Sequence, residues 1–305
     1  MARKIVVATR KSALALAQTR ALMAELVRVH PGLEIEELHV TTTGDKIQDR
    51  ALNAIGGKGL FVKEIEEALL DRRADLAVHS LKDVPAELAS PSLVIGCTPR
   101  REDPRDVVVT RDGRPLAAQA AGSKVGTSSL RRSVQLKLAF PALEIVPMRG
   151  NVDTRLRKVA DGTVDVAVLA RAGLTRLGLL DKVTETLDPE LCIPAAGQGA
   201  LALEHRVDDR ELAELLAPLA DGDTAIAVAV ERGVLSAVEG SCQIPVAAHA
   251  RRAGNELVLA SLLAEPDGSN VRRKSARTTW PANEAEARRF GVEVGNALRV
   301  GGQTR

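Results

Sequence analysis

The sequence predicts an α/β protein with two similar lobes, followed by a small α+β domain. Between residues 4 and 204, apolar segments typical of buried strands alternate with segments that have helical spacing. The order of these segments from residue 4 to 80 recurs from residue 123 to 170, which indicates an internal repeat. After residue 219 a new pattern begins, with a helix, two strands and a final helix.

Each element of the first lobe follows from its local pattern. KIVVAT (4–9) is apolar and β-branched, so it predicts a buried strand, and a helix follows with Ser12 as its N-cap. That helix carries Leu14, Leu22, Leu26 and Val29 on one face. HPGLEIEELHV predicts the second strand, TTTGDKIQD and GGKGLF predict loops, VKEIEEALLDRR predicts a helix, and ADLAVHS predicts a third strand.

The second lobe repeats this order. SKVGTSSLRRSVQLKLAF predicts a strand, a hydroxyl-rich turn and a helix. FPALEIVPMRGN parallels HPGLEIEELHVTTTGD, and GTVDVAVLA parallels RRADLAVHS around Asp75 and Asp165. Two segments, CTPRREDPRD (97–106) and PAAGQGALALE (194–204), are interpreted as crossings between the lobes, so we expect the first lobe to be discontinuous.

The expected domains are residues 1–99 with 200–218, residues 100–199, and residues 219–305. The last of these is expected to contain the strands VAAHA and ELVLASLLAEP. Its final helix has Ala287, Phe290, Val294 and Leu298 at helical spacing.

Composition excludes several classes of function. The 305 residues are 45% hydrophobic and 27% charged, which is typical of a globular protein. A net charge of +2 and only 3 Phe, 1 Trp and no Tyr argue against nucleic-acid binding. No apolar run reaches the ~18 residues that span a bilayer, and no signal peptide is recognisable, so we expect no membrane contact and a cytoplasmic location. Cys97, Cys192 and Cys242 form no CxxC pair, so we expect neither a disulfide framework nor a metal site.

Basic and hydroxyl side chains follow three predicted strands. The groups are Arg10, Lys11 and Ser12; TSSLRR (127–132); and Arg149 with Arg155 in RGNVDTRL. A serine N-cap and solvated surface arginines are the alternative interpretation. Because all three groups lie where strands end and helices begin, the pattern favours a cleft for a ligand with several negative charges.

HSLKDVP (79–85) places Lys82 and Asp83 together at the end of a predicted strand. In an extended stretch these adjacent side chains point in opposite directions, so one could hold a substrate carboxylate while Asp83 stabilises a reacting cation. The alternative is that Asp83 is a turn residue before Pro85 and that His79 is packed or hydrogen-bonded. GGKGLFVKE lacks the spacing of a phosphate-binding P-loop and is interpreted as a mobile loop over the cleft.

The third free thiol, Cys242 in GSCQIPVAAHA, lies in a bend between small residues. Burial explains such a cysteine, and so does reactivity. His249 follows seven residues later, and nothing in the sequence indicates that it faces the sulfur.

Taken together, these motifs resemble a known family. ATRKSALALAQT, TTTGDK, GGKGLFVKE, HSLKDVP, REDPRD, GTSSLRR, RGNVDTRL, AAGQGALALE and GSCQIP occur in the order seen in the hydroxymethylbilane synthase (porphobilinogen deaminase) family. The resemblance extends from residue 4 into the third domain and is looser after about residue 250. Two positions depart from the usual pattern: Ala54 stands where many relatives have lysine, and His249 where tyrosine is frequent.

The resemblance implies a fold and an activity. The fold would be two periplasmic-binding-protein-like (type II) lobes around a cleft, plus the small α+β domain. The activity would be that of a transferase of porphyrin and heme biosynthesis, which condenses four porphobilinogen molecules head to tail with loss of ammonia. Hydrolysis would then release hydroxymethylbilane. The expected partner is porphobilinogen alone, without metal, nucleic acid or membrane, and the expected state is a monomer.

The resemblance also implies roles for individual residues. One dipyrromethane cofactor per chain would be attached to Cys242 through a thioether, and Asp83 would be the catalytic residue. The other residues expected to bind the cofactor are Lys82, Thr127, Ser128, Ser129, Arg131, Arg132 and Arg155. Those expected to bind substrate carboxylates are Arg10, Ser12, Arg149, Arg155 and Arg176.

Two other classes of function stay open at this point. A binding module for an acidic ligand would share the cleft but give Cys242 no role. A cysteine-dependent transferase or hydrolase would pair Cys242 with His249.

Overall fold

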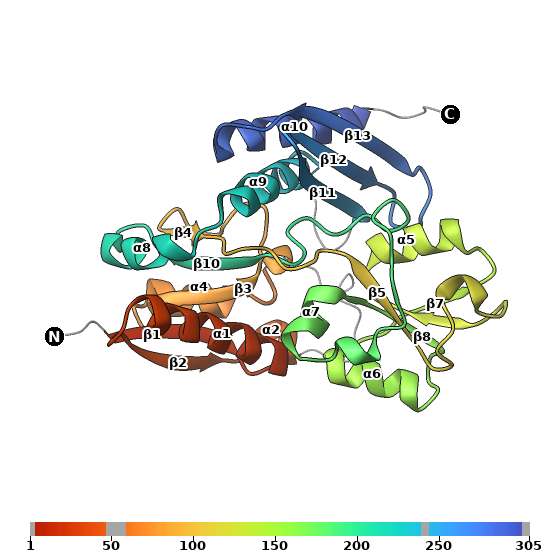
Figure 1. The fold of residues 1–305 in the computed structure, drawn as a ribbon, viewed down its shortest axis with the longest axis horizontal. Coiled ribbons are helices and arrows are strands. Elements are labelled where there is room, and N and C mark those ends of the chain that lie inside the picture. Colours follow the sequence, from red (N-terminus) through yellow and green to blue (C-terminus); the bar gives the residue numbers. More distant parts are fainter. Residues whose placement is uncertain (1–3, 47–58, 239–243, 301–305) are drawn as a thin grey trace. The chain divides into compact units, whose positions relative to one another are not determined.

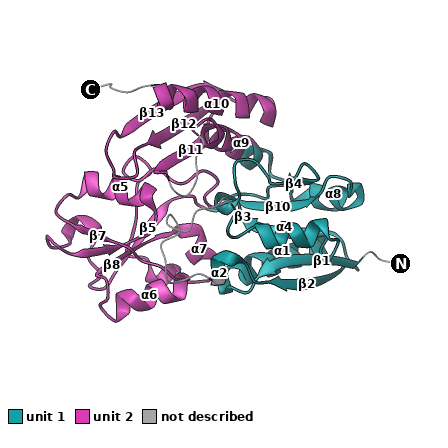
Figure 2. Cartoon of the chain, turned by 180° about the vertical axis from the view of Figure 1, so that it is seen from behind, with its two compact units in different colours: residues 1–47, 57–102, 200–225 teal, residues 48–56, 103–199, 226–305 magenta. Residues whose placement is uncertain are grey.

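The computed structural model describes residues 4–46, 59–238 and 244–300 (Figure 1). The chain forms two compact units (Figure 2). Unit 1 comprises residues 1–47, 57–102 and 200–225, and unit 2 comprises residues 48–56, 103–199 and 226–305. Unit 1 is therefore discontinuous, as the two predicted crossings imply.

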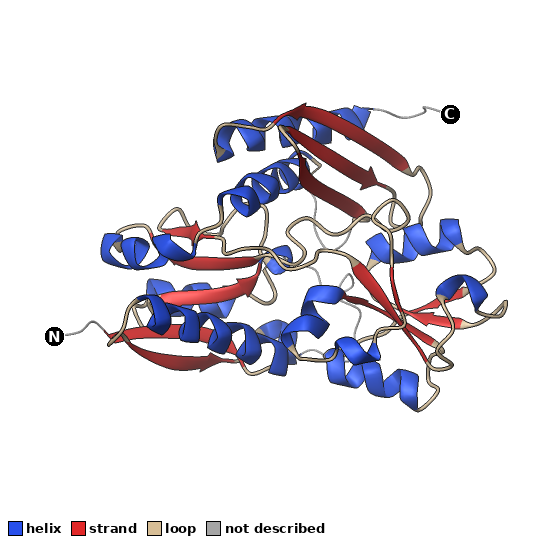
Figure 3. Cartoon of the chain, viewed as in Figure 1, coloured by secondary structure: helices blue, strands red, loops and turns tan. Residues whose placement is uncertain are grey.

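Unit 1 is built on a five-stranded sheet. Its order is β2 (Glu34–Val40), β1 (Lys4–Arg10), β3 (Leu76–Ser80), β10 (Leu201–Arg206) and β4 (Leu93–Cys97). β1 is parallel to β2 and β3, whereas β10 is antiparallel to both of its neighbours. Helices flank this sheet (Figure 3).

Both faces of this sheet are buried. Leu22 and Leu26 of α1 (Ala13–Val29) pack with Val7 and Leu203 on one face, together with α8 (Arg210–Leu216). Ile65 of α4 (Lys63–Leu70) packs on the other face. The successive strand residues Leu76 and Ala77 belong to the two different clusters, as the two-residue period of a strand requires. The near-continuous apolar run of the first strand in the sequence is thereby explained.

Unit 2 contains a second sheet of the same design. Its order is β7 (Glu144–Val146), β6 (Lys124–Gly126), β8 (Val166–Ala170), β5 (Asp106–Thr110) and β9 (Glu185–Thr186). β6 is parallel to β7 and β8, and β5 is antiparallel to β8. Its helices are α5 (Leu130–Ala139), α6 (Val152–Ala160) and α7 (Arg171–Arg176). Each strand therefore has a counterpart in unit 1, and the predicted fold class is confirmed.

Two equivalent aspartates make the repeat concrete. Asp75 and Asp165, the pair around which the two sequence segments align, precede β3 and β8. Each accepts one hydrogen bond from the backbone of the neighbouring parallel strand. Each accepts another from an arginine at the end of the neighbouring antiparallel strand. The bonds join Asp75 to the Val6 N–H at 3.0 Å and to Arg206 at 2.9 Å, and Asp165 to the Lys124 N–H and to Arg111, both at 2.9 Å. The shared contacts confirm the internal repeat.

The C-terminal part of unit 2 is a three-stranded antiparallel sheet with helices. The strands are β11 (Val246–Ala253), β12 (Glu256–Leu263) and β13 (Arg272–Thr279), and the helices are α10 (Glu284–Val300) and α9 (Gly222–Ala237), of which the residues from 226 on belong to unit 2. On the final helix, Ala287, Val294 and Leu298 are buried and Phe290 packs beside them, as predicted. The other sheet face supplies Ala247 and Leu262 to a cluster with Val134 of α5.

Three features differ from the expectations. The segment 43–46, predicted as loop, is a single helical turn, α2 (Thr43–Lys46). The predicted crossings are shorter than expected, because residue 97 ends β4, residue 106 begins β5 and residues 201–204 belong to β10. β13 was not predicted at all.

No helix within the described ranges is long and apolar enough to cross a membrane.

Candidate active site

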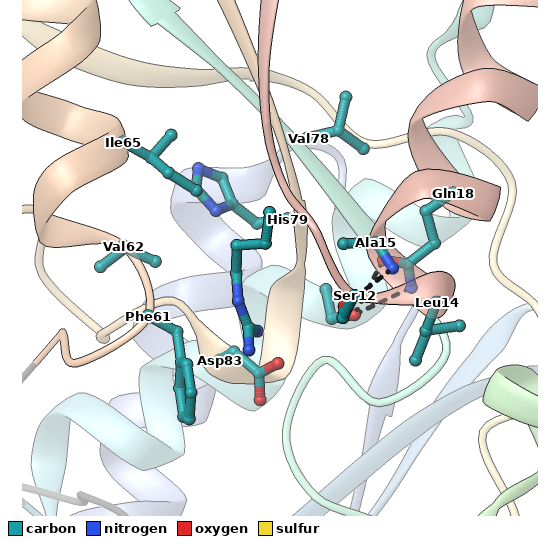
Figure 4. Close-up of a pocket in the computed structure, with 12 residues that line it drawn as sticks. Ser12, Leu14, Ala15, Gln18, Phe61, Val62, Ile65, Val78, His79 and Asp83 are labelled. Atoms are coloured by element: carbon teal, nitrogen blue, oxygen red, sulfur yellow. Dashed lines mark hydrogen bonds between the residues drawn. The ribbon is translucent and has the colours of Figure 1, made fainter. Parts of the chain in front are cut away.

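A pocket of unit 1 lies at the carboxyl ends of β1 and β3 (Figure 4). These two parallel strands are neighbours in the sheet, so the residues that follow them come together at one edge. The lining residues are Arg10, Ser12, Leu14, Ala15, Gln18, Phe61, Val62, Ile65, Val78, His79, Ser80 and Asp83. The pocket therefore brings together three predicted site residues, namely Arg10, Ser12 and Asp83.

Asp83 is exposed at the end of a short 3₁₀ turn (Leu81–Asp83) that follows β3. The turn is anchored by Leu81, which is buried and donates its N–H to the Ala200 carbonyl at 3.0 Å. The expectation of an extended stretch was wrong, so the argument that Lys82 and Asp83 point in opposite directions does not hold. A 3₁₀ turn instead separates successive side chains by about a third of a turn. Asp83 lines the pocket, whereas Lys82 is not among the lining residues.

His79 is hydrogen-bonded in the core beside the pocket. Its Nε2 lies 2.9 Å from Glu204 Oε2, and both side chains are buried. His79 and Glu204 are diagonal neighbours on adjacent strands, and Glu66 of α4 is buried near them. The alternative of a packed, hydrogen-bonded histidine is confirmed.

Glu66 makes the stability of unit 1 depend on pH. Burial and the charge of Glu204 raise the pKa of Glu66, although His79 lowers it. Since the folded pKa exceeds the unfolded one, the protonated carboxyl stabilises the fold at low pH, and this contribution is lost as the pH rises through the folded pKa. Glu66→Gln is therefore expected to increase stability relative to wild type more at pH 8 than at pH 4.5. Thermal unfolding at both values, with exposed Glu67→Gln as control, measures this; an identical difference at the two pH values would contradict it.

Arg10 is held on two sides. Its guanidinium Nε lies 3.1 Å from Asp45 Oδ2, and its Nη2 also donates to Asp45. The guanidinium carbon lies 4.3 Å from the centre of the Phe61 ring, close enough for a cation–π interaction. Sequence reasoning missed both partners, because the two segments that carry them were interpreted as loops.

Ser12 is the N-cap of α1, as predicted. Its Oγ accepts a hydrogen bond from the Ala15 N–H at 3.3 Å. The side chain also lines the pocket, so capping does not preclude contact with a ligand.

In unit 2 the hydroxyl-rich turn follows β6. Ser128 Oγ donates to the Met148 carbonyl at 2.9 Å, which fixes the turn beside the end of β7. Thr127 is buried, and its Oγ1 accepts from the Ser129 N–H at 3.2 Å. Ser129 is the N-cap residue of α5 but makes no side-chain capping bond. The alternative of a serine N-cap is therefore correct for the position of Ser129 but not for a capping hydrogen bond. The roles of these residues in cofactor binding stay predictions.

Arg131 and Arg132 form a buried ionic triad with Asp106, a residue that the sequence analysis did not single out. Arg131 Nη1 and Arg132 Nη2 lie 2.8 and 2.7 Å from the Asp106 carboxylate. Gln198 Nε2 donates to the same carboxylate at 2.8 Å, and the Cys192 thiol lies 3.4 Å from it. Burial alone would raise the pKa of Asp106, but the two guanidinium charges outweigh it and lower that pKa. The triad carries a net charge of +1.

The remaining predicted arginines of unit 2 lie after β7 (Arg149), within α6 (Arg155) and at the C-terminal end of α7 (Arg176). Arg155 Nε donates to the Gly150 carbonyl at 2.8 Å, and Arg176 Nη2 donates to the Gly199 carbonyl at 2.6 Å. Arg149 follows β7 and is half-buried. All three keep part of their surface accessible, and their binding roles stay predictions.

Cys242, Ala54 and most of the GGKG loop lie outside the described residues. Burial raises the pKa of Cys97 and Cys192, the two cysteines that are described, to about 12 in each case. Neither thiol forms a thiolate readily under neutral conditions. Over residues 4–46, 59–238 and 244–300, no cluster of three or more His, Cys, Asp or Glu side chains has the arrangement of a metal site.

These features define a class of protein. Two α/β lobes of one design each carry cationic and hydroxyl side chains where parallel strands end, an arrangement that suits the binding of a small anionic molecule. Two family models match the chain: "Porphobilinogen deaminase, dipyromethane cofactor binding domain" over residues 5–214, and "Porphobilinogen deaminase, C-terminal domain" over residues 225–299. The chain belongs to the porphobilinogen deaminase family, and the predicted family, transferase class and dipyrromethane cofactor are confirmed.

Two individual relatives match this chain over nearly its full length. The chain is 58% identical to the porphobilinogen deaminase of Sorangium cellulosum over 301 residues, which are 99% of this chain and 100% of that protein. It is 49% identical to the porphobilinogen deaminase of Syntrophobacter fumaroxidans over 303 residues, covering 99% and 96%. Among solved structures, it is similar to the BenM effector binding domain with its effector benzoate, with a TM-score of 0.45, 14% identity and coverage of 72% of this chain and 92% of that one.

Proposed function

We propose that this chain condenses four porphobilinogen molecules head to tail into hydroxymethylbilane, with release of ammonia at each coupling. The match of the cofactor-binding family model to residues 5–214 carries this proposal. The geometry of unit 1 supports it, because an exposed carboxylate and an arginine line the same pocket. Each porphobilinogen carries two carboxylates, so cationic and hydroxyl donors at strand ends suit both substrate and product.

Asp83 is the proposed catalytic residue. Loss of ammonia from porphobilinogen generates positive charge on the pyrrole, and an ionised carboxylate in the pocket stabilises that charge. The same carboxylate can accept the proton that leaves the attacked ring carbon. Arg10 and Ser12 would hold substrate carboxylates in the same pocket, while Arg149, Arg155 and Arg176 would bind those of the growing chain.

The donor set of unit 2 fits the dipyrromethane cofactor. Among the described residues, Nε of Arg131 and Nε of Arg132 are buried without a hydrogen-bond partner. Together with the net charge of +1 of the triad, these unused donors favour an anionic ligand beside α5. When bound, the cofactor supplies the pyrrole ring from which the chain grows. We propose that Cys242 carries it through a thioether and that Lys82, Thr127, Ser128, Ser129 and Arg155 bind it with the two arginines.

We also propose the three-domain division, with residues 1–99 and 200–218, 100–199, and 219–305 as the domains. The start of the C-terminal family model at residue 225 supports a boundary near the beginning of α9. We further propose that the chain acts as a monomer in the cytoplasm, as the family resemblance implies.

The activity is tested directly with purified protein and porphobilinogen. We expect porphobilinogen to disappear, ammonia to be released in a one-to-one ratio with it, and a linear tetrapyrrole to appear that cyclises spontaneously to a porphyrinogen. Porphobilinogen that stays unchanged in the presence of protein with attached cofactor would contradict the proposal. Binding without turnover would instead support a binding protein.

A further inference from the structure

The proposed substrate arginine of unit 1 is already occupied by a carboxylate of the protein. Asp45 lies side-on to the Arg10 guanidinium, with Nε 3.2 and 3.1 Å from its two oxygens and Nη2 donating to Oδ1. This bidentate arrangement is the one that a substrate acetate or propionate takes on an arginine. Both side chains are about a quarter exposed, at 23% and 26%, so the pair lies where a ligand can reach it.

Asp45 is held in this position by its own segment. Its Oδ2 accepts hydrogen bonds from the Thr42 hydroxyl at 2.8 Å and from the Thr42 N–H at 3.2 Å. A further bond fixes the start of the same turn, because the Thr43 N–H donates to Glu64 at 2.8 Å. The Asp45 carboxylate is therefore fixed by its own segment beside Arg10, a residue that lines the pocket.

Arg10 has a second contact besides the one with Asp45. The Phe61 ring covers one face of the guanidinium at 4.3 Å from the guanidinium carbon. A ligand carboxylate that takes the Nε–Nη2 edge must therefore displace Asp45, and cannot simply draw the arginine away. Two carboxylates on one guanidinium leave an excess negative charge, which opposes simultaneous binding.

We propose that Asp45 is an internal competitor of the substrate: its carboxylate occupies the substrate subsite on Arg10 and is displaced by porphobilinogen. This inference rests on the proposed function. A simple monocarboxylate gains only the arginine contact and therefore competes weakly with a tethered carboxylate. Porphobilinogen has two carboxylates and makes further contacts in the pocket, so it can displace Asp45. Asp45 thus lowers the affinity for every carboxylate by a similar factor, so that a monocarboxylate binds too weakly to occupy the subsite whereas porphobilinogen still binds.

The test is Asp45→Asn, which keeps the size of the side chain and removes its charge. We expect KM for porphobilinogen to fall about threefold to tenfold, the range of a partly exposed ion pair, with kcat changed less than twofold. Acetate and propionate, which are expected to inhibit the wild type weakly, should inhibit the variant at correspondingly lower concentrations. The matched control is Asp112→Asn, which removes the charge of an aspartate that also pairs with an arginine but lies in unit 2. It should change neither KM for porphobilinogen nor the inhibition by acetate and propionate.

A double-mutant cycle identifies the route of the effect. In an Arg10→Gln background, Asp45→Asn should no longer change KM, because the competitor has lost its target. A KM that is unchanged or raised in Asp45→Asn would overturn the proposal and assign Asp45 to positioning Arg10 instead. Failure of the proposed function is distinguishable, since the wild type would then not turn over porphobilinogen at all.

Discussion

Asp83→Asn is expected to leave the fold intact and to remove most of the turnover. The side chain is exposed at the end of the 3₁₀ turn that follows β3, so the amide fits without disturbing the core. An amide cannot stabilise developing positive charge as a carboxylate does, nor accept a proton. A loss of about 10²- to 10⁴-fold in kcat is expected from these two roles.

Steady-state kinetics at saturating porphobilinogen measures this loss, and thermal unfolding verifies the fold. Asp71→Asn changes an exposed aspartate at the end of α4 in the same unit and is the control. The variant should still carry the cofactor, because the proposed attachment residue is unchanged. Wild-type kcat in Asp83→Asn would remove this residue from the mechanism.

Asp106→Ala is expected to destabilise unit 2 by about 3–5 kcal/mol, the usual result of removing one member of a buried ionic cluster. Asp106 is 0% exposed, and Arg131 and Arg132 are each 5% exposed. Without the carboxylate, two like charges would remain buried next to each other. Because its folded pKa is lowered, Asp106 contributes stability above its unfolded pKa, and this is lost only as the pH falls through the lower folded value.

Urea unfolding followed by circular dichroism measures the loss. Asp112→Ala removes an exposed carboxylate that also pairs with an arginine, and it should cost far less stability than Asp106→Ala. A second readout is the amount of bound cofactor at a temperature where Asp106→Ala is folded. Because Arg131 and Arg132 would lose the carboxylate that positions them, the amount of bound cofactor should fall. Stability equal to the control would show that the triad contributes nothing to the fold.

Elements with a strong local pattern could be predicted from the sequence. The buried strands around Val7, Val78 and Val168 are apolar runs, and the repeat was visible from the segments around Asp75 and Asp165. β13 could not be predicted, because its RRKSARTT sequence is almost entirely polar and is paired only on one side, with β12. Its conformation depends on a partner strand, which a local pattern does not contain.

Residues of the candidate site could be predicted where they lie at the ends of strands, as Arg10 and Asp83 do. The residues that pair with the site arginines could not be predicted. Asp106 is 25 residues from Arg131 in the sequence and appears there only as the end of a polar crossing segment. Asp45 stood in a segment interpreted as loop, and the ion pair with Arg10 depends on the parallel pairing of β1 with β2. Tertiary pairing creates these contacts, so composition and spacing do not reveal them.

The central claim is that a pair of pyrrole rings is bound covalently to Cys242. Intact-protein mass spectrometry of freshly purified active enzyme tests it most directly, with Cys242→Ser as the control and Ehrlich's aldehyde reagent as a colour assay. The account predicts a mass above that of the sequence by one dipyrromethane, located by peptide mapping on Cys242 and absent from the control. An active wild-type protein with the bare mass of the sequence and no pyrrole colour would contradict it.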